Sequence, residues 1–97
     1  MAHNLSVIDT PAVLIDIDKA EVNLERAQDY ANRHRLKLRP HIKTHKLPYF
    51  ARRQMELGAI GITCQKIGEA EVMAEVCDDI LVAYPPVGER RAMRLAQ

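Results

Sequence analysis

Residues 59–84, AIGITCQKIGEAEVMAEVCDDILVAY, decide the fold class of this chain. The runs 59–64 and 79–84 are short and almost continuously apolar, and 68–77 between them places its apolar residues at helical spacing. Short runs that are apolar on both faces are typical of parallel strands covered by helices. The stretch therefore predicts a strand, a helix and a second strand parallel to the first.

The alternation of predicted strands and helices begins near the N-terminus. A β-branched, apolar run at 12–17 predicts a strand, and Asp18 with Glu21 three residues later resembles the capping box that opens a helix. We expect that helix to end near Arg33. Its small and apolar side chains at 20, 24, 27 and 31 form one stripe, which predicts one buried face.

Further strands and helices follow in the same order. Residues 37–44 predict a second extended run, and 48–57 predict a helix with Pro48 in its first turn and Gly58 as its C-terminal cap. After the strand at 79–84, two prolines lead into a last helical stretch from Gly88. The alternation predicts an α/β fold with parallel strands, either a doubly wound sheet or the N-terminal part of a (β/α)8 TIM-type barrel.

Composition excludes several classes of protein. The 97 residues are 47% hydrophobic and 28% charged, with a net charge of +1, as in ordinary soluble domains. No apolar run of about 18 residues predicts a membrane span, and the first ten residues lack the pattern of a secretory signal. We therefore expect a cytoplasmic protein without a membrane partner. Cys64 and Cys77 fit no metal or disulfide motif, which predicts structural roles.

The end of the sequence predicts that the chain is part of a longer one. Residues 88–97, GERRAMRLAQ, stop inside a helical pattern without a capping glycine, a proline or a following strand. Three βα repeats would also leave an unpaired apolar sheet edge. We expect residues 1–97 to be the N-terminal portion of a barrel domain. The alternative is a complete small α/β domain, whose core would be marginal.

The segment 38–46, LRPHIKTHK, carries the strongest chemical signal. On a strand, Arg39, His41, Lys43 and His45 would share one face, which in a barrel would point into the lumen near the carboxyl ends of the strands. Neighbouring cations and partial burial favour the neutral amine of a lysine, the form that attacks a carbonyl carbon. Lys43 is therefore the candidate nucleophile of this face.

Three other interpretations of this segment were open. Its basic face could be only the solvated side of an edge strand. His41 and His45 could bind a metal, but on a straight strand they lie about 13 Å apart, too far to share one ion unless the backbone turns at Thr44. The local basic residues could bind nucleic acid, but no aromatic side chains are interleaved with them for base stacking. We expect neither a metal site in this segment nor a nucleic-acid partner.

Four motifs, in this order, resemble the D-threonine aldolase and D-serine dehydratase family of fold-type III pyridoxal phosphate enzymes. They are TPA at 10–12, RPHIKTHK at 39–46, GEAE at 68–71 and DDIL at 78–81. The octapeptide at 39–46 is specific, whereas the other three are weak alone. The resemblance spans residues 9–84 and implies an N-terminal domain like that of alanine racemase, with the remaining barrel and a C-terminal β domain absent from this chain.

The resemblance implies that Lys43 forms the Schiff base with pyridoxal 5'-phosphate and that Lys46 is only a neighbour. Strand alternation agrees, because Lys46 falls on the opposite face. We expect His41, Gln65 and Tyr84 to contact the cofactor, since Gln65 and Tyr84 follow the ends of two predicted strands. Arg39 and His45 would help to shape that pocket.

The implied activity is cleavage of β-hydroxy-D-amino acids to glycine and an aldehyde, as by a D-threonine aldolase. A D-serine dehydratase and a non-catalytic pyridoxal phosphate-binding protein on the same fold are the alternatives. The resemblance also implies a divalent metal (Zn, Mn or Mg) bound by C-terminal residues outside this chain, and a homodimer in the full-length form. The 97 residues alone are expected to be inactive.

Overall fold

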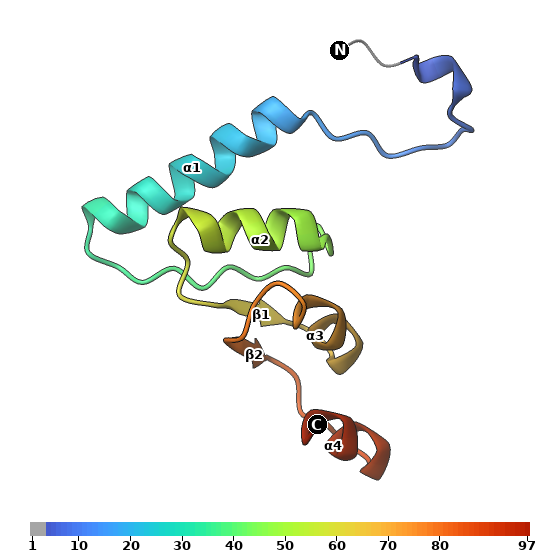
Figure 1. Ribbon diagram of the computed structural model, residues 1–97, viewed down its shortest axis with the longest axis vertical. Helices are drawn as coiled ribbons and strands as arrows, with labels where there is room; N and C mark the ends of the chain where they lie inside the picture. The colour runs from blue at the N-terminus through green and yellow to red at the C-terminus, as the bar shows by residue number, and fades with distance from the viewer. Residues whose placement is uncertain (1–3) are drawn as a thin grey trace.

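The computed structural model describes residues 4–97 and contains the predicted parallel sheet (Figure 1). Strands β1 (Ile62–Cys64) and β2 (Ile80–Val82) are parallel, and Ile62 pairs with Ile80. Helix α3 (Ile67–Met73) connects them. The strand–helix–strand prediction for 59–84 is confirmed, but each element is shorter than its apolar run.

The segment 38–42 lies beside β1 as a third parallel row of the sheet. The Ile60 N–H donates to the Leu38 carbonyl at 2.9 Å, and the Ile42 N–H donates to the Thr63 carbonyl at 3.0 Å. His41 and Thr63 form a parallel bridge. The extended run predicted for 37–44 ends early, because the backbone turns at 43–45.

Two longer helices precede β1 and pack against each other. Helix α2 is Pro48–Leu57, with proline in its first turn and Gly58 as its C-cap at a φ of 124°, as predicted. Helix α1 is Ile17–Arg33. Its N-cap is Asp16, whose carboxylate accepts the Lys19 N–H at 3.1 Å, so the predicted start at Asp18 is wrong by two positions.

An ion-pair cluster joins α1 to α2, which lie side by side in Figure 1. Arg53 of α2 contacts Glu21, and its guanidinium lies 3.8 Å from Glu25 and 3.4 Å from Glu56. The hydrogen bond from Arg53 lowers the pKa of the Glu21 carboxyl. Because these groups are partly exposed, we expect the cluster to contribute little to the stability of the fold. Its main effect would be to fix the relative orientation of the two helices.

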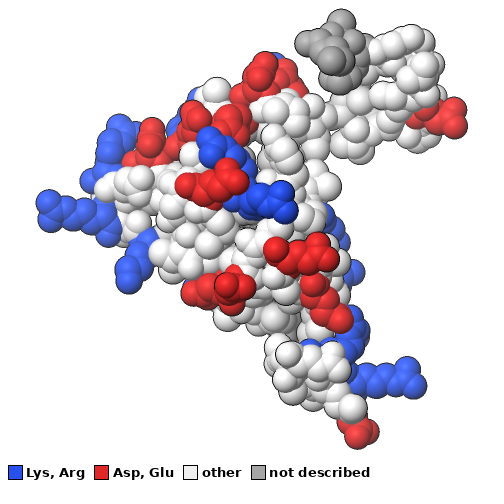
Figure 2. Space-filling view, viewed as in Figure 1, with Lys and Arg blue, Asp and Glu red and all other residues white. Residues whose placement is uncertain are grey.

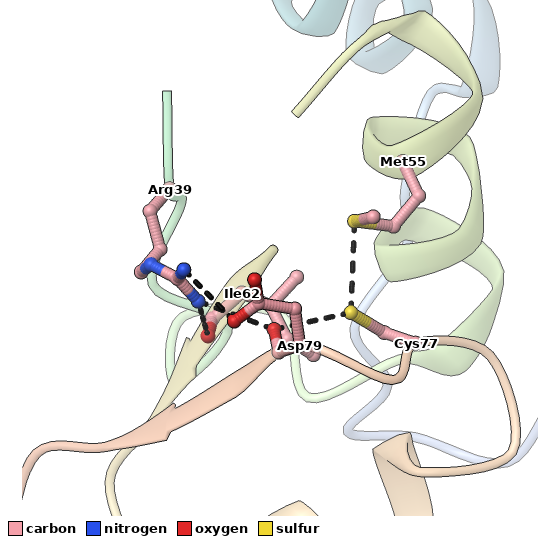
Figure 3. Close-up of polar contacts among 5 residues, drawn as sticks. All are labelled: Arg39, Met55, Ile62, Cys77 and Asp79. Carbon is pink, nitrogen blue, oxygen red and sulfur yellow. Dashed lines mark hydrogen bonds and ion pairs between the residues drawn. The ribbon is translucent and has the colours of Figure 1, made fainter. Parts of the chain in front are cut away.

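The core lies between the sheet and helices α2 and α3. It is a cluster of six buried side chains: Ile42, Ala51, Ile62, Cys64, Met73 and Cys77. Both cysteines are free and buried, which confirms their structural interpretation. The Cys77 thiol donates to the Asp79 carbonyl at 3.3 Å and lies 3.6 Å from the Met55 sulfur (Figure 3).

The N-terminal segment differs from its prediction. Residues 5–7 form a short 3-10 helix, and residues 12–16 have no strand partner among residues 4–97, so the predicted strand at 12–17 is wrong for this structure. The side chain of Val13 is 93% exposed. A β-branched run becomes a strand only where another backbone satisfies its N–H and C=O groups. Figure 1 shows this segment extending away from the helices.

The C-terminal helix follows its prediction. Helix α4 is Glu89–Leu95, with Gly88 as its N-cap. Arg94 of α4 forms an ion pair with Glu71 of α3. Within the described range 4–97, no helix has the length and apolar character needed to cross a bilayer.

A β-bulge lies where the third row meets β1. Leu38 and Pro40, two residues apart, accept hydrogen bonds from Ile60 and Thr63, which are three residues apart. One extra residue is therefore accommodated on the β1 side. Gly61 lies inside this bulge and is buried.

We expect Gly61→Ala to destabilise the protein by about 1–3 kcal/mol, because the site cannot hold a methyl group. A Cβ atom there would lie 2.5 Å from the Asp79 carbonyl oxygen and 2.5 Å from the Arg39 guanidinium. Urea unfolding measures the change. Gly68→Ala is the matched control, since its Cβ would meet only Arg94 at 3.8 Å. Equal stability of the two variants would contradict the bulge.

Candidate functional site

The carboxyl ends of the three parallel rows bring candidate residues to one edge of the sheet. His41 is in register with Thr63, and Thr63 with Leu81. Two residues further along, these rows reach Lys43, Gln65 and Ala83. Lys43 and Gln65 thus each follow the carboxyl end of one of two neighbouring rows.

Lys43 is on an exposed turn, not on a strand. The turn spans residues 43–45 and is closed by a 2.8 Å hydrogen bond from the Lys46 N–H to the Ile42 carbonyl. The sequence predicted that Lys43 is partly buried. In the described chain, residues 4–97, its side chain is exposed. Ile42 beside it is completely buried and anchors the start of the turn.

His41 supports the turn directly. Its Nδ1 accepts the Lys43 backbone N–H at 3.2 Å, and the side chain is half-buried. This contact requires the tautomer without a proton on Nδ1. His41 is therefore placed beside Lys43, as predicted, and contacts its backbone.

His45 corrects the predicted basic face. Because the backbone turns after Ile42, strand alternation no longer applies to residue 45. Its Nε2 lies 3.2 Å from the Gln54 amide oxygen of α2, and its ring packs edge-on against Phe50. Burial lowers the pKa of His45, and the contact with Gln54 opposes that shift only in part. His45 thus packs against the helical layer.

Arg39 binds the backbone of the sheet. Its guanidinium donates to the carbonyls of Ile62 at 3.3 Å and Asp79 at 3.2 Å, and it lies 2.9 Å from the Asp79 carboxylate (Figure 3). These partners lie where β1 and β2 begin, away from their carboxyl ends. The basic face predicted from alternation is therefore divided among three different environments.

Gln65 and Tyr84 line one groove, as their positions after two strands suggested. The groove has a volume of about 520 Å³ and lies between the carboxyl ends of β1 and β2, the start of α3 and helix α4. Arg91 of α4 also lines it. Its volume is within the range of small-molecule and cofactor sites. Lys43 is not part of its lining.

Glu69 is the functional candidate that sequence reasoning missed. It lies in the first turn of α3 and is only 7% exposed. One carboxylate oxygen accepts the Gln65 N–H at 2.8 Å, and the other lies 3.3 Å from the Lys46 ammonium. The only signal in the sequence was the position of this glutamate, three residues after Lys66. Its partner Lys46 is distant in the chain, so the sequence did not indicate the ion pair.

The pKa of Glu69 makes the stability of this contact depend on pH. Burial raises the pKa, but the Gln65 N–H and the charge of Lys46 outweigh burial and hold it below the ordinary value of 4.5. The carboxylate therefore stabilises the fold above pH 4.5, and that stability is lost as the pH falls through the lower folded pKa.

We expect Glu69→Gln to lessen the acid-induced loss of stability below pH 4.5, because the group that takes up a proton on unfolding is gone. Urea unfolding at a series of pH values measures this slope. Glu71→Gln is the matched control, since Glu71 is exposed and pairs with Arg94 outside this contact. Identical slopes for the two variants would contradict the role of Glu69.

The two histidines and the basic side chains of this segment also bear on metal and nucleic-acid binding. The turn at 43–45 removes the geometric objection to a shared ion, but Nδ1 of His41 and Nδ1 of His45 accept the N–H groups of Lys43 and Leu47. In the range 4–97, no group of three His, Cys, Asp or Glu side chains is arranged so that it could hold a metal ion. Basic and acidic side chains are interspersed on the face in Figure 2.

Comparisons confirm the resemblance in sequence. A D-threonine aldolase from Arthrobacter sp is 43% identical over 94 residues, which cover 96% of this chain and 25% of the relative. A D-threo-3-hydroxyaspartate dehydratase from Delftia sp. (strain HT23) is 40% identical over 84 residues, covering 86% of this chain and 22% of the relative. The chain thus spans about a quarter of the length of these relatives. No protein-family profile matches it.

A solved structure shares the fold. The D-threonine aldolase of Filomicrobium marinum superposes with a TM-score of 0.87 at 46% sequence identity, over 92% of this chain and 24% of that one. The chain is therefore a small α/β unit that matches part of that aldolase.

Proposed function

We propose that this chain supplies the cofactor-binding lysine, Lys43, of a pyridoxal phosphate-dependent lyase that cleaves β-hydroxy-D-amino acids to glycine and an aldehyde. The observation that carries the proposal is the position of Lys43 on the turn that follows the carboxyl end of a parallel row of the sheet. The similarity to a D-threonine aldolase at 43% identity supports it. Because the chain spans a quarter of that relative, activity belongs to a longer protein.

We place the three parallel rows in a (β/α)8 barrel, as the N-terminal portion of an alanine racemase-like domain. Helices α2 and α3 pack on one side of the rows, and the candidate residues lie at the carboxyl ends, where such barrels bind substrates. A cytoplasmic homodimer remains our prediction for the full-length protein.

The residues at this edge fit the cofactor. Lys43 offers an exposed primary amine for its aldehyde, and the groove beside Gln65 and Tyr84 has a suitable volume and polar side chains. Lys43, His41, Gln65 and Tyr84 would hold it. When bound, pyridoxal phosphate supplies an electron sink for the negative charge that develops at Cα of an amino acid.

The residues of this chain position the amine and exclude water below it. His41 holds the backbone of Lys43 through the Nδ1 contact of 3.2 Å. Ile42, the residue before the turn, and Cys64 are both fully buried members of the core cluster. A rigid, dry base of this kind restricts the positions that the amine can reach.

A dehydratase is the second candidate, because the Delftia relative carries that name. The two reactions differ in their products: an aldolase releases an aldehyde and glycine, whereas a dehydratase acting on D-serine releases pyruvate and ammonia. A non-catalytic carrier would bind the cofactor and release neither. Assays with D-threonine and D-serine distinguish the three.

We also propose a divalent metal, bound by residues outside this chain. A solved structure of a D-threo-3-hydroxyaspartate dehydratase mutant is in a metal-free form. Removal of metal by a chelator should then lower turnover by the longest expressible form of the protein, and adding Zn, Mn or Mg should restore it.

The experiment that tests the cofactor assignment is borohydride reduction in the presence of pyridoxal phosphate, followed by peptide mapping. It is done on the longest form of the protein that can be expressed. We expect one tagged lysine, Lys43. No uptake, or a tag spread over many surface lysines, would refute the proposal.

A further inference from the structure

Two primary amines flank the turn that would present the cofactor-binding lysine. Lys43 opens the turn at 43–45, and Lys46 follows it with a positive φ of 53°. The backbone hydrogen bond from Lys46 to Ile42 holds both lysines at the same edge of the sheet. Chain position alone therefore does not explain why one amine, and not the other, should react with an aldehyde.

The structure distinguishes the two amines by their partners. The Lys46 ammonium lies 3.3 Å from a carboxylate oxygen of Glu69, whose side chain is 6% exposed. Lys43 makes no ion pair with any of residues 4–97. The ion pair occupies the amine of Lys46, whereas attack on a carbonyl carbon needs an amine whose lone pair is free.

Glu69 also contacts the neighbouring loop. Its other oxygen accepts the Gln65 N–H at 2.8 Å, so one carboxylate joins the turn after Ile42 to the loop after β1. Those two segments carry Lys43 and Gln65. Glu69 is thus in a position both to occupy Lys46 and to hold the two cofactor-binding segments together.

We propose that Glu69 is a positioning residue that directs the cofactor aldehyde to Lys43 by holding the Lys46 side chain in an ion pair. This inference rests on the proposed function. In the directed step, the nitrogen lone pair of Lys43 attacks the aldehyde carbon, a C=N bond replaces the C=O bond, and the two amine protons leave with the oxygen as water. Borohydride then reduces the C=N bond to a stable secondary amine that marks the lysine.

The first test uses the unaltered protein and formaldehyde with cyanoborohydride, which methylates free amines without a cofactor site. We expect Lys46 to be methylated about three- to fivefold more slowly than Lys43, the size of effect that a partly exposed ion pair supports. Equal rates would overturn the inference. The methylation test does not use pyridoxal phosphate. Its result therefore tests the inference about Lys46 separately from the proposed function.

The second test maps the pyridoxal phosphate tag in Glu69→Gln. The glutamine can still accept the Gln65 N–H, but it cannot pair with Lys46. We expect the Lys46 share of the tag to rise about fivefold or more, and Lys46→Arg to keep the tag on Lys43 alone. Glu71→Gln, on the same helix, should leave the distribution unchanged.

Two outcomes of the second test oppose the inference. They are a tag confined to Lys43 in Glu69→Gln, and an equal redistribution in Glu71→Gln. If Glu69→Gln does not fold, the methylation rates of Lys43 and Lys46 in the unaltered protein decide whether the inference stands. A merely structural role of Glu69 would lower the total uptake of cofactor in the variant but would not move the tag from one lysine to the other.

Discussion

Lys43→Ala should abolish covalent attachment of pyridoxal phosphate and reduce turnover at least about 1,000-fold in the longest expressible form of the protein. The reason is chemical: among residues 4–97, Lys43 combines an exposed amine with a backbone contact to His41 after the carboxyl end of a sheet row. Peptide mapping after borohydride reduction and product assays measure the two effects.

The matched control is Lys37→Ala, which removes an exposed lysine of the same segment before it joins the sheet. It should leave attachment and turnover unchanged. Full turnover by Lys43→Ala would contradict the enzyme assignment. Salt-dependent binding to generic DNA that Lys43→Ala barely weakens would instead favour nucleic-acid binding by the basic segment.

Ile42→Ala should destabilise the protein by about 2–5 kcal/mol, the range for truncating a fully buried isoleucine. Ile42 is 0% exposed, and its core cluster includes Ile62 and Met73, so a cavity would open under the sheet. The loss of stability should be near the upper end of this range if the neighbouring side chains cannot move to fill the cavity. Urea or thermal unfolding measures it.

Val72→Ala is the control for this prediction. Val72 lies on α3, where its side chain is 52% exposed, so its truncation should change stability by no more than about 0.5 kcal/mol. If Ile42→Ala were as mild as Val72→Ala, the segment 38–42 would not be part of the core. The parallel third row would then be in doubt.

Several features followed from the sequence by itself because their causes are local. Pro48 has no N–H to lose at the start of a helix, and Gly58 tolerates the positive φ that ends it, so the bounds of α2 were predicted correctly. The apolar runs in 59–84 predicted parallel strands, because only strands covered by helices are apolar on both faces. The choice of Lys43 over Lys46 came from the octapeptide and its alternation.

Other features depended on contacts between residues far apart in the chain. The turn after Ile42 sends His45 to α2, the backbone of Asp79 leaves no room for a side chain at Gly61, and Glu69 meets Lys46 across more than 20 positions. Helix caps and hydrophobic periods act within a few residues, whereas strand pairing, bulges and ion pairs between loops depend on which segments the fold brings together. The sequence thus determined helix α2, the parallel strand–helix–strand unit and which lysine is the candidate, whereas the tertiary structure decided what surrounds that lysine and left residues 12–16 without a strand partner.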